Sequence, residues 1–418
     1  KPFIVDRLQF KRDYKGYLDR YRTHLYTFVP GDSTAVQITS GDFDDISPVW
    51  KPDGTSIAFV SNRTDNPDGN SNSDIWIVSA DNKDKGKTLL QLTKNTNADT
   101  SPEWSLDGSH LTYTTITDKE AIWYATQKLA IIPATGGDPK ILAEKLDRNI
   151  SNPKFSPDGK QIYFILEESG TSKIASIQPS GKNFRRIIKG DISIRDYAMN
   201  GDFIFPLLGK SLQPHEIYSY KNDKLTKLIG CNDSIVLHRK KPVVEKITFK
   251  SGDGTAIEGF VVKPIEFDPT MKYPMILWNH GGPVSQYEFS FHTISQLFAA
   301  NGFVTLLINP RGSSGYGQAF SEIIFADWGN KDYQDVMAGV DYAINSGYVD
   351  EERLGVGGWS YGGMLTNYVI TKSDRFKGAI SGASASLYRA NYGHDHYQLF
   401  WEMELGLPWE NAEAWEKI

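Results

Sequence analysis

The sequence predicts a mixed fold, in which an incomplete β-propeller over residues 1–240 precedes an α/β domain over residues 241–418. Three observations support this prediction. A phrase repeats at a long, regular interval in the first part, which is typical of propellers and other repeat arrays. Strands alternate with helical segments in the second part, which indicates a largely parallel sheet. That second part also contains a Gly-x-Ser-x-Gly pattern between a strand and a helix.

The repeat is carried by three aligned segments whose turn aspartates lie roughly 50 residues apart. The segments are SPVWKPDGTSIAFVS (47–61), SPEWSLDGSHLTYTT (101–115) and NPKFSPDGKQIYFIL (152–166). In each, an aromatic residue ends one strand, an Asp-Gly turn reverses the chain, and a second strand follows. Several short strands in each repeat fit a propeller blade of four strands.

A weaker fourth unit at 197–223 and a partial sheet around 24–29 bring the expected number of blades to four or five. Propellers usually close with more blades, so we expect that part of the propeller is missing on the N-terminal side. The alternative is a β-sandwich whose hairpins resemble one another by chance, and the three aligned copies argue against it. The first residues lack the layout of a signal peptide, and the compartment stays open.

The second part begins with the segment 247–264 and continues as alternating strands and helices. Its apolar runs end in Gly-rich loops, as buried parallel strands do, and its helices end at glycines. The expected elements are strand 273–282, helix 294–302, strand 303–312, helix 331–347, strand 353–360 and strand 376–384.

Ser360 is the predicted nucleophile. It lies in GWSYGG (358–363), where a serine on a sharp strand-to-helix turn forms a nucleophile elbow. In this α/β-hydrolase arrangement, one oxyanion donor is the backbone N–H after the serine, which is that of Tyr361. The second comes from the loop after an earlier strand, here NHGGP (279–283), and we expect Gly282 in this role with Gly281 as alternate.

A serine needs a histidine base and a carboxylate that orients it, and in this fold both follow the serine in the chain. His394, Asp395 and His396 come too early, because the sheet still lacks the strands whose ends deliver the acid and the base. His280 is expected to have a structural role. The hydrolase domain is therefore expected to be truncated at its C-terminal end, with the triad Asp and His not in this chain.

Composition excludes several other classes. The net charge of −6 argues against nucleic acid as a partner. No apolar run of ~18 residues is present, so we expect no membrane partner. The single cysteine, Cys231, cannot form an internal disulfide or a cysteine-based metal site. We expect no metal and no cofactor, and the sequence leaves open whether the protein is a homo-oligomer.

These motifs together, with NPRGSSGYG (309–317) and DWGNKDYQDVMAGVDY (327–342), resemble those of the prolyl oligopeptidase family of serine peptidases (S9). The likeness is strongest to its acylaminoacyl-peptidase and dipeptidyl-peptidase branch. The resemblance implies that the propeller restricts entry to short peptides and that Ser360 attacks the peptide carbonyl. It also places substrate near the segment 388–401. The substrate-binding candidates are Arg311, Tyr388, Tyr392 and Trp401.

Purely structural roles remain open for these four residues. Arg311 could bridge loops, and the aromatic residues could pack in a core. Acyl-peptide, dipeptide and general oligopeptide release are not distinguished, since no paired glutamates for a free N-terminus are evident in the propeller part. An esterase on the same fold is one alternative function. A catalytically inert propeller binding protein is another.

Overall fold

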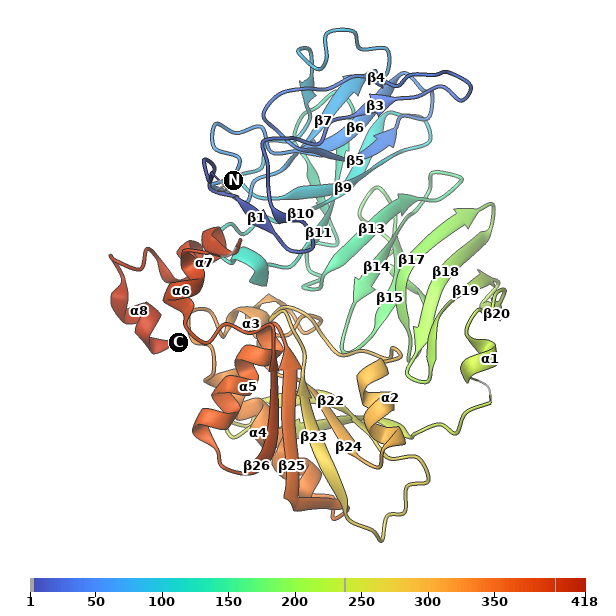
Figure 1. The fold of residues 1–418 in the computed structure, drawn as a ribbon. Coiled ribbons are helices and arrows are strands. Elements are labelled where there is room, and N and C mark those ends of the chain that lie inside the picture. The colour runs from blue at the N-terminus through green and yellow to red at the C-terminus, as the bar shows by residue number, and fades with distance from the viewer. Residues whose placement is uncertain (1–3, 237, 395) are drawn as a thin grey trace.

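The computed structural model describes residues 4–236, 238–394 and 396–418. Figure 1 shows a group of β-sheets formed by the N-terminal half above an α/β unit formed by the C-terminal half. The chain crosses from one to the other after β20 and the short helix α1 (Asp233–Val236). The proposed boundary at residue 240 falls between α1 and β21 (Val244–Lys250).

The described N-terminal half contains four antiparallel blades of four strands each, as the repeats predict. Short hairpins precede them. The hairpins are β1 (Lys11–Arg12) with β2 (Gly16–Tyr17), and β3 (Tyr26–Thr27) with β4 (Val36–Gln37). The blades are β5 (Asp45–Trp50), β6 (Ser56–Ser61), β7 (Asp74–Ser79) and β8 (Leu90–Gln91); β9 (Asp99–Trp104), β10 (His110–Thr115), β11 (Lys128–Pro133) and β12 (Lys140–Leu142); β13 (Ile150–Phe155), β14 (Ile162–Glu167), β15 (Ser172–Ile177) and β16 (Arg185–Ile188); and β17 (Ser193–Asn200), β18 (Phe203–Lys210), β19 (Gln213–Lys221) and β20 (Lys224–Lys227).

The three repeated segments share their local geometry. Each turn aspartate accepts the backbone N–H two residues later, at 2.9 Å for Asp53, 3.0 Å for Asp107 and 3.1 Å for Asp158. Each copy also has a register shift between its first two strands. The residue before proline has a left-handed φ in every copy, 52° at Ser47, 56° at Ser101 and 52° at Asn152. The sequence predicted the turn but not this bulge.

The third and fourth blades are joined into one sheet. Their only register pair is parallel and connects Ser172 of β15 with Ser193 of β17, within the described residues. Both serines of this narrow connection also bind a side chain of the α/β unit, that of Glu288.

The α/β unit is a six-stranded sheet with the order β21-β22-β24-β23-β25-β26. The four strands β24, β23, β25 and β26 run parallel, and β21 and β22 are antiparallel. The remaining strands are β22 (Ala256–Val262), β23 (Tyr273–Asn279), β24 (Val304–Asn309), β25 (Val349–Trp359) and β26 (Phe376–Gly382). The helices are α2 (Thr293–Ala300), α3 (Gln318–Glu322), α4 (Lys331–Asn345), α5 (Tyr361–Lys372), α6 (Tyr388–Tyr392), α7 (Gln398–Leu405) and α8 (Ala412–Lys417).

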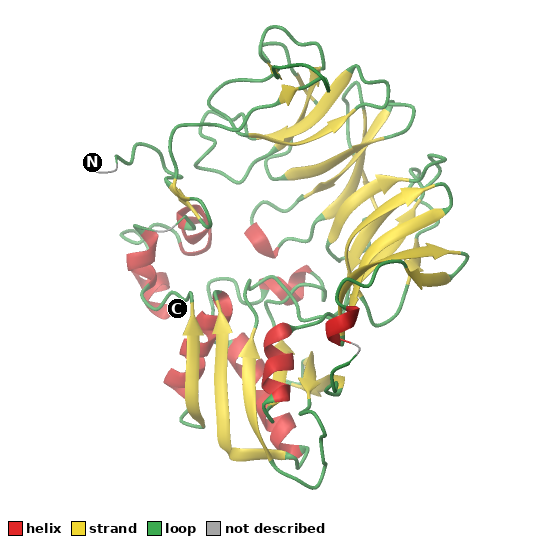
Figure 2. Ribbon diagram, turned by 45° about the vertical axis from the view of Figure 1, so that its right-hand side comes forward, coloured by secondary structure: helices red, strands yellow, loops and turns green. Residues whose placement is uncertain are grey.

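Successive side chains of a strand face opposite sides of the sheet, so each face has its own core. Leu277 packs on one face with Val340 of α4 and Leu365 of α5. Its neighbour Trp278 packs on the other face with Ala299 of α2. Figure 2 shows α2 in front of the sheet and the other long helices behind it. The predicted fold class, a propeller followed by an α/β-hydrolase sheet, is confirmed.

No helix in the described part of the chain is both long enough and apolar enough to cross a membrane.

Candidate active site

Ser360 lies at the junction of β25 and α5, where the chain turns sharply. Its φ of 58° and ψ of −124° are strained for a residue with a side chain. The turn is held by the Ser360 N–H, which donates to the Gly382 carbonyl of β26 at 2.9 Å. Because α5 begins at Tyr361, its first N–H groups have no acceptors within the helix and lie beside Ser360. This is the geometry of a nucleophile elbow.

The glycines of the elbow are required by close backbone packing. A Cβ on Gly362 would collide with the Asn279 carbonyl oxygen at the end of β23. A Cβ on Gly358 would collide with the Gly362 carbonyl oxygen. The elbow therefore packs directly against the end of the strand that precedes the predicted oxyanion loop.

That oxyanion loop, residues 279–283, passes directly beside the nucleophile. A Cβ placed on Gly281 would lie 3.5 Å from the Cβ of Ser360 and 3.1 Å from the Trp359 carbonyl oxygen. Gly282 has a φ of 130°, which favours glycine. The structure thus brings Ser360 and Tyr361 beside Gly281, the residue before Gly282 in the predicted oxyanion loop.

Tyr361 is also fixed through its side chain. Its hydroxyl donates to the Asp332 carboxylate, and its ring meets Trp328 edge to face with centroids 5.4 Å apart. Burial raises the pKa of Asp332, although the Tyr361 hydroxyl and two backbone N–H groups lower it. The residue that carries the first predicted oxyanion donor is therefore anchored in the core of the α/β unit.

No hydrogen bond joins Ser360 to any histidine, and all histidines lie in the described residues. The ring nitrogens of His280 contact the Gly281 carbonyl oxygen at 2.7 Å and the Ser313 hydroxyl at 3.0 Å. Burial lowers the pKa of His280. His396 lies 3.7 Å from Asp13, and Asp395 lies outside the described residues. These contacts fit a structural role for His280.

A cavity of about 850 Å³ lies between the two halves of the molecule. Gly282 and Pro283 of the oxyanion loop line it, and Ser360 is not among its lining residues. From the four blades, the lining includes the charged residues Glu167 and Arg195 and several carboxamide side chains, which are those of Asn62, Asn70, Asn72, Asn97, Gln127 and Asn149. The charged residues that line the cavity include Arg12, Arg22, Asp68, Glu167, Arg195 and Glu288.

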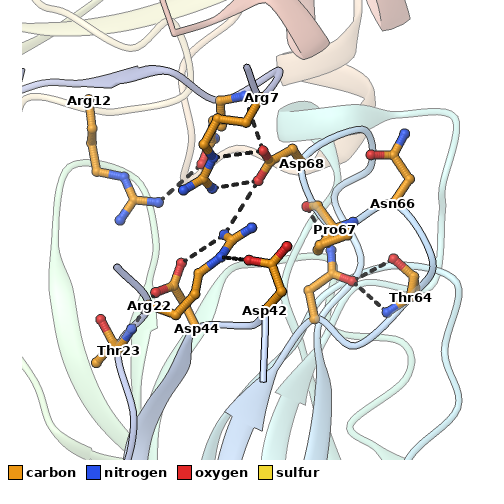
Figure 3. Close-up of polar contacts among 12 residues, drawn as sticks. Arg7, Arg12, Arg22, Thr23, Asp42, Asp44, Thr64, Asn66, Pro67 and Asp68 are labelled. Atoms are coloured by element: carbon orange, nitrogen blue, oxygen red, sulfur yellow. Dashed lines mark hydrogen bonds and ion pairs between the residues drawn. The ribbon is translucent and has the colours of Figure 1, made fainter. Parts of the chain in front are cut away.

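An N-terminal strap, residues 7–22, lies along this cavity and is tied down by ion pairs. Figure 3 shows Arg7 and Arg22 converging on Asp68, with Arg12 apart from them. Arg7 binds Asp68 through two nitrogens at 2.9 and 2.7 Å, and Arg22 contacts the same carboxylate at 3.5 Å. Burial opposes the charge of Asp68, but Arg7 lowers the pKa of this carboxyl below its usual value. The strap is thereby fastened to the first blade.

Tyr124 joins the two halves of the molecule from the end of the 3₁₀ turn η1 (Ile122–Tyr124) in the second blade. Tyr124 is buried in the core of the α/β unit. Its hydroxyl donates to Glu404 of α7 at 2.7 Å and accepts from the Trp328 indole N–H at 2.8 Å. Its neighbour Trp123 stacks on Phe400 with centroids 4.8 Å apart. Figure 1 shows η1 close to α7.

Glu404 makes this contact dependent on pH. Burial raises the pKa of Glu404 from 4.5 to about 7, so the folded protein binds this proton more tightly than the unfolded chain. The stabilisation that the bound proton of Glu404 gives the folded state is complete below pH ~4.5 and is lost as the pH rises to about 7. The unfolding free energy of the natural protein should therefore fall between pH 5 and 8. We expect Glu404→Gln to make this fall smaller by about 2–3 kcal/mol. Urea unfolding at four pH values measures this.

The control for this prediction is Glu402→Gln on the same helix, where the carboxylate is half-buried and bound by the Tyr392 hydroxyl. It should leave the pH profile of the natural protein unchanged. Parallel profiles for Glu404→Gln and the natural protein would show that Glu404 is already ionised at pH 5 in the folded state.

Arg311 is buried between loops. Its guanidinium binds Asp335 of α4 at 2.9 and 2.6 Å, Asp253 of the β21–β22 turn at 2.5 Å and the Ser251 hydroxyl at 3.3 Å. Only 3% of its side chain is exposed, and it does not line the cavity. This placement favours the bridging role over substrate binding, which stays an untested prediction.

The three aromatic candidates take different positions. Tyr388 and Trp401 are buried with Trp328 in the core, with ring centroids 6.0 and 5.5 Å from it. Tyr392 is partly exposed and packs on Trp409 and Trp415. From this segment it is His396, Leu399 and Phe400 that line the cavity, and the sequence did not single them out for binding. The predicted roles of Tyr388, Tyr392 and Trp401 remain untested.

Comparison with known proteins agrees with this geometry. Residues 289–418 match the prolyl oligopeptidase family, Peptidase S9. The uncharacterized peptidase YuxL of Bacillus subtilis is 29% identical over 100% of this chain and 66% of its own length. Dipeptidyl-peptidase 5 of Porphyromonas gingivalis is 27% identical over 88% of this chain and 54% of its own length.

Among solved structures, the acylaminoacyl peptidase of Pyrococcus horikoshii superposes with a TM-score of 0.77 at 26% identity, over 89% of this chain and 57% of that one. An acylaminoacyl peptidase in complex with Z-Gly-Gly-Phe-chloromethyl ketone matches equally well. The resemblance to the prolyl oligopeptidase family that the motifs predicted is confirmed, and the family model matches residues 289–418. It spans between about half and two thirds of the length of these relatives.

Proposed function

We propose that this chain is the nucleophile-bearing part of a serine peptidase that hydrolyses short peptides through an acyl-enzyme on Ser360. The observation that carries the proposal is the elbow itself, a strained serine beside an oxyanion loop at the edge of the cavity between the two halves. The propeller contributes most of the cavity wall and would limit entry to short, extended peptides.

In the proposed reaction the Ser360 hydroxyl oxygen attacks the peptide carbonyl while a histidine base takes its proton. The backbone N–H groups of Tyr361 and Gly282 stabilise the negative charge on the tetrahedral intermediate, and such donors are worth about 3–4 kcal/mol each. Return of the proton to the amine leaving group breaks the peptide bond and leaves an acyl ester on Ser360. Water activated by the same base then releases the acid and restores the serine.

We propose that the histidine and its carboxylate partner come from residues outside 1–418. The exposed side of β26 supports this proposal. Ile380 on that strand is 59% exposed and Trp359 at the end of β25 is 64% exposed, although apolar side chains of an α/β sheet are normally covered. Further strands beside β26 would bury them and would place loop residues next to Ser360.

Fluorophosphonate labelling tests the nucleophile. The protein at its natural length should label at a single serine, and Ser360→Ala should abolish both labelling and peptide hydrolysis. Ser384→Ala, a serine hydrogen-bonded to Asn367 and Ser381 near the same edge, is the matched control and should label normally. Equal labelling of the natural protein and Ser360→Ala would refute the proposed nucleophile.

Substrate panels separate the remaining functions. Acetyl-amino acid, dipeptidyl and longer peptide anilides report on the three kinds of peptide release, and p-nitrophenyl butyrate reports on esterase activity. The cavity favours the peptides, so we expect the highest kcat/KM on a peptide anilide. If p-nitrophenyl butyrate is the best substrate, the esterase alternative is favoured. If the fluorophosphonate probe does not label Ser360, the inert binding protein is favoured.

A further inference from the structure

The segment that follows the oxyanion loop contacts the propeller. Beyond Pro283 the chain runs toward the third propeller blade, and its residues alternate between two sets of partners. Tyr287 is held by the α/β unit, where its N–H donates to the Asn309 side chain at 2.6 Å and its hydroxyl donates to the Trp278 carbonyl oxygen at 2.8 Å. The residues on either side of Tyr287 bind the propeller.

Gln286 and Phe289 bind the turn between β14 and β15. The Gln286 side chain accepts the Gly170 N–H at 2.8 Å and donates to the Thr171 carbonyl oxygen at 3.1 Å. The Phe289 N–H donates to the Gly170 carbonyl oxygen at 2.9 Å. Gly170 has a φ of 69° and lies against Phe260, so the turn fits closely onto the α/β unit.

Glu288 reaches the connection between the third and fourth blades. Its carboxylate accepts the Ser172 hydroxyl at 2.6 Å and the Ser193 hydroxyl at 2.5 Å. These two serines form the single register pair that joins β15 to β17. One carboxylate of the α/β unit thus binds both blades at the point where they meet.

The carboxylate of Glu288 lies near charged groups of the propeller. Burial raises the pKa of Glu288, the two serine hydroxyls lower it, and the nearby charges are Glu167 and Arg195. Glu167 is itself bound across the same boundary by the Ser314 hydroxyl at 2.5 Å.

We infer that Glu288 is a positioning residue, through which the third and fourth blades fix the oxyanion loop at Gly282. This inference rests on the proposed function, because it assigns the propeller a part in forming the oxyanion hole. Glu288 lies six positions after Gly282, and both line the same cavity. A shift of the loop by about 1 Å is enough to cost on the order of 100-fold in rate.

The test compares kcat and KM per titrated active site in the natural-length protein. Glu288→Ala should lower kcat by about 10- to 100-fold with little change in KM for a small substrate, because the loop donor serves the transition state. Glu288→Gln should recover most of kcat, since its amide can accept from one serine and donate to the other. The double variant Ser172→Ala/Ser193→Ala should behave like Glu288→Ala.

Glu168→Ala is the matched control. Glu168 lies next to the same turn, but its carboxylate binds Arg186 of its own blade at 2.9 and 2.5 Å. It should leave kcat unchanged. If Glu288→Ala and Glu168→Ala have the same kcat, the positioning role is overturned, whatever either variant does to stability.

A second measurement does not need activity. In a Ser360→Ala background, amide hydrogen exchange in the segment 281–285 should be faster in Glu288→Ala than in Glu168→Ala, because the loop loses its anchor. Unchanged exchange would overturn the inference even if the enzyme is active. Faster exchange, together with no labelling at Ser360 in the natural-length protein that keeps this serine, would support the anchor and refute the proposed function.

Discussion

Replacing Tyr124 by alanine is expected to lower the unfolding free energy by about 4 kcal/mol or more and to loosen the two halves of the molecule. Truncation of a buried aromatic side chain alone costs about 3–5 kcal/mol. Tyr124 is 1% exposed, although it comes from the propeller and is buried in the core of the α/β unit. The variant also removes the acceptor of the Trp328 indole N–H and one of the two donors to Glu404, which keeps the Ala326 N–H. A buried donor left unpaired, as the indole N–H would be, costs about 1–3 kcal/mol.

Urea unfolding and small-angle X-ray scattering together measure this effect. Tyr124→Phe keeps the ring and should lose only the hydroxyl contribution. Tyr197→Ala is the control, since Tyr197 is equally buried but lies among residues of the last two blades. It should reduce stability without increasing the radius of gyration. An unchanged radius of gyration in Tyr124→Ala would show that other contacts hold the halves together.

Arg311→Ala is expected to cost about 3–5 kcal/mol, because it leaves the fully buried Asp335 carboxylate without its cation. The same change at Arg353, which is 55% exposed and pairs with the partly exposed Asp350, should cost less than about 1 kcal/mol. Denaturant unfolding of the two variants gives the comparison.

Kinetics distinguish the two roles considered for Arg311. A bridging arginine predicts that Arg311→Lys loses stability, because lysine cannot reproduce the two-pronged contact with Asp335. KM of the molecules that remain folded should stay the same. A large rise in KM with nearly normal stability would instead favour the substrate-binding role.

The features that the sequence predicted well are local. A propeller blade can be recognised in the sequence from its turn. The Asp-Gly pair and the alternating strand lie within 15 residues of one another, as in 47–61. The elbow is predictable for the same reason. Strand, serine and helix are consecutive, and the steric demand for Gly358 and Gly362 appears in the same six residues.

The features that it missed depend on contacts between distant segments. Glu288 follows an aromatic residue in a loop and has no local signal, since its partners Ser172 and Ser193 are about 100 residues away in the chain. Tyr124 lies in AIWYAT (121–126), an apolar aromatic run in a propeller connection that could have indicated burial. One sequence alone does not show that Tyr124 packs in the core of the α/β unit rather than in that of its own blade.

The aromatic segment 388–401 shows a third kind of difficulty. The helices α6 and α7 are only five and eight residues long, so a short apolar pattern does not decide which side faces the core. Tyr388 and Trp401 face the core, whereas Phe400 faces the cavity. Adjacent residues in one helix thus have different surroundings, which only the packing partners determine.

The close approach of the elbow to Asn279 bears on how sequence variation in this region should be interpreted. A Cβ at position 362 collides with backbone rather than with a side chain that could move aside. Selection for folding alone would therefore keep glycine there, even in a protein that has lost its activity. Selection for folding alone would not keep serine at position 360, because its φ of 58° is strained for a residue with a side chain. Across a set of relatives, the serine would report on chemistry, and the glycines beside it would report only on architecture.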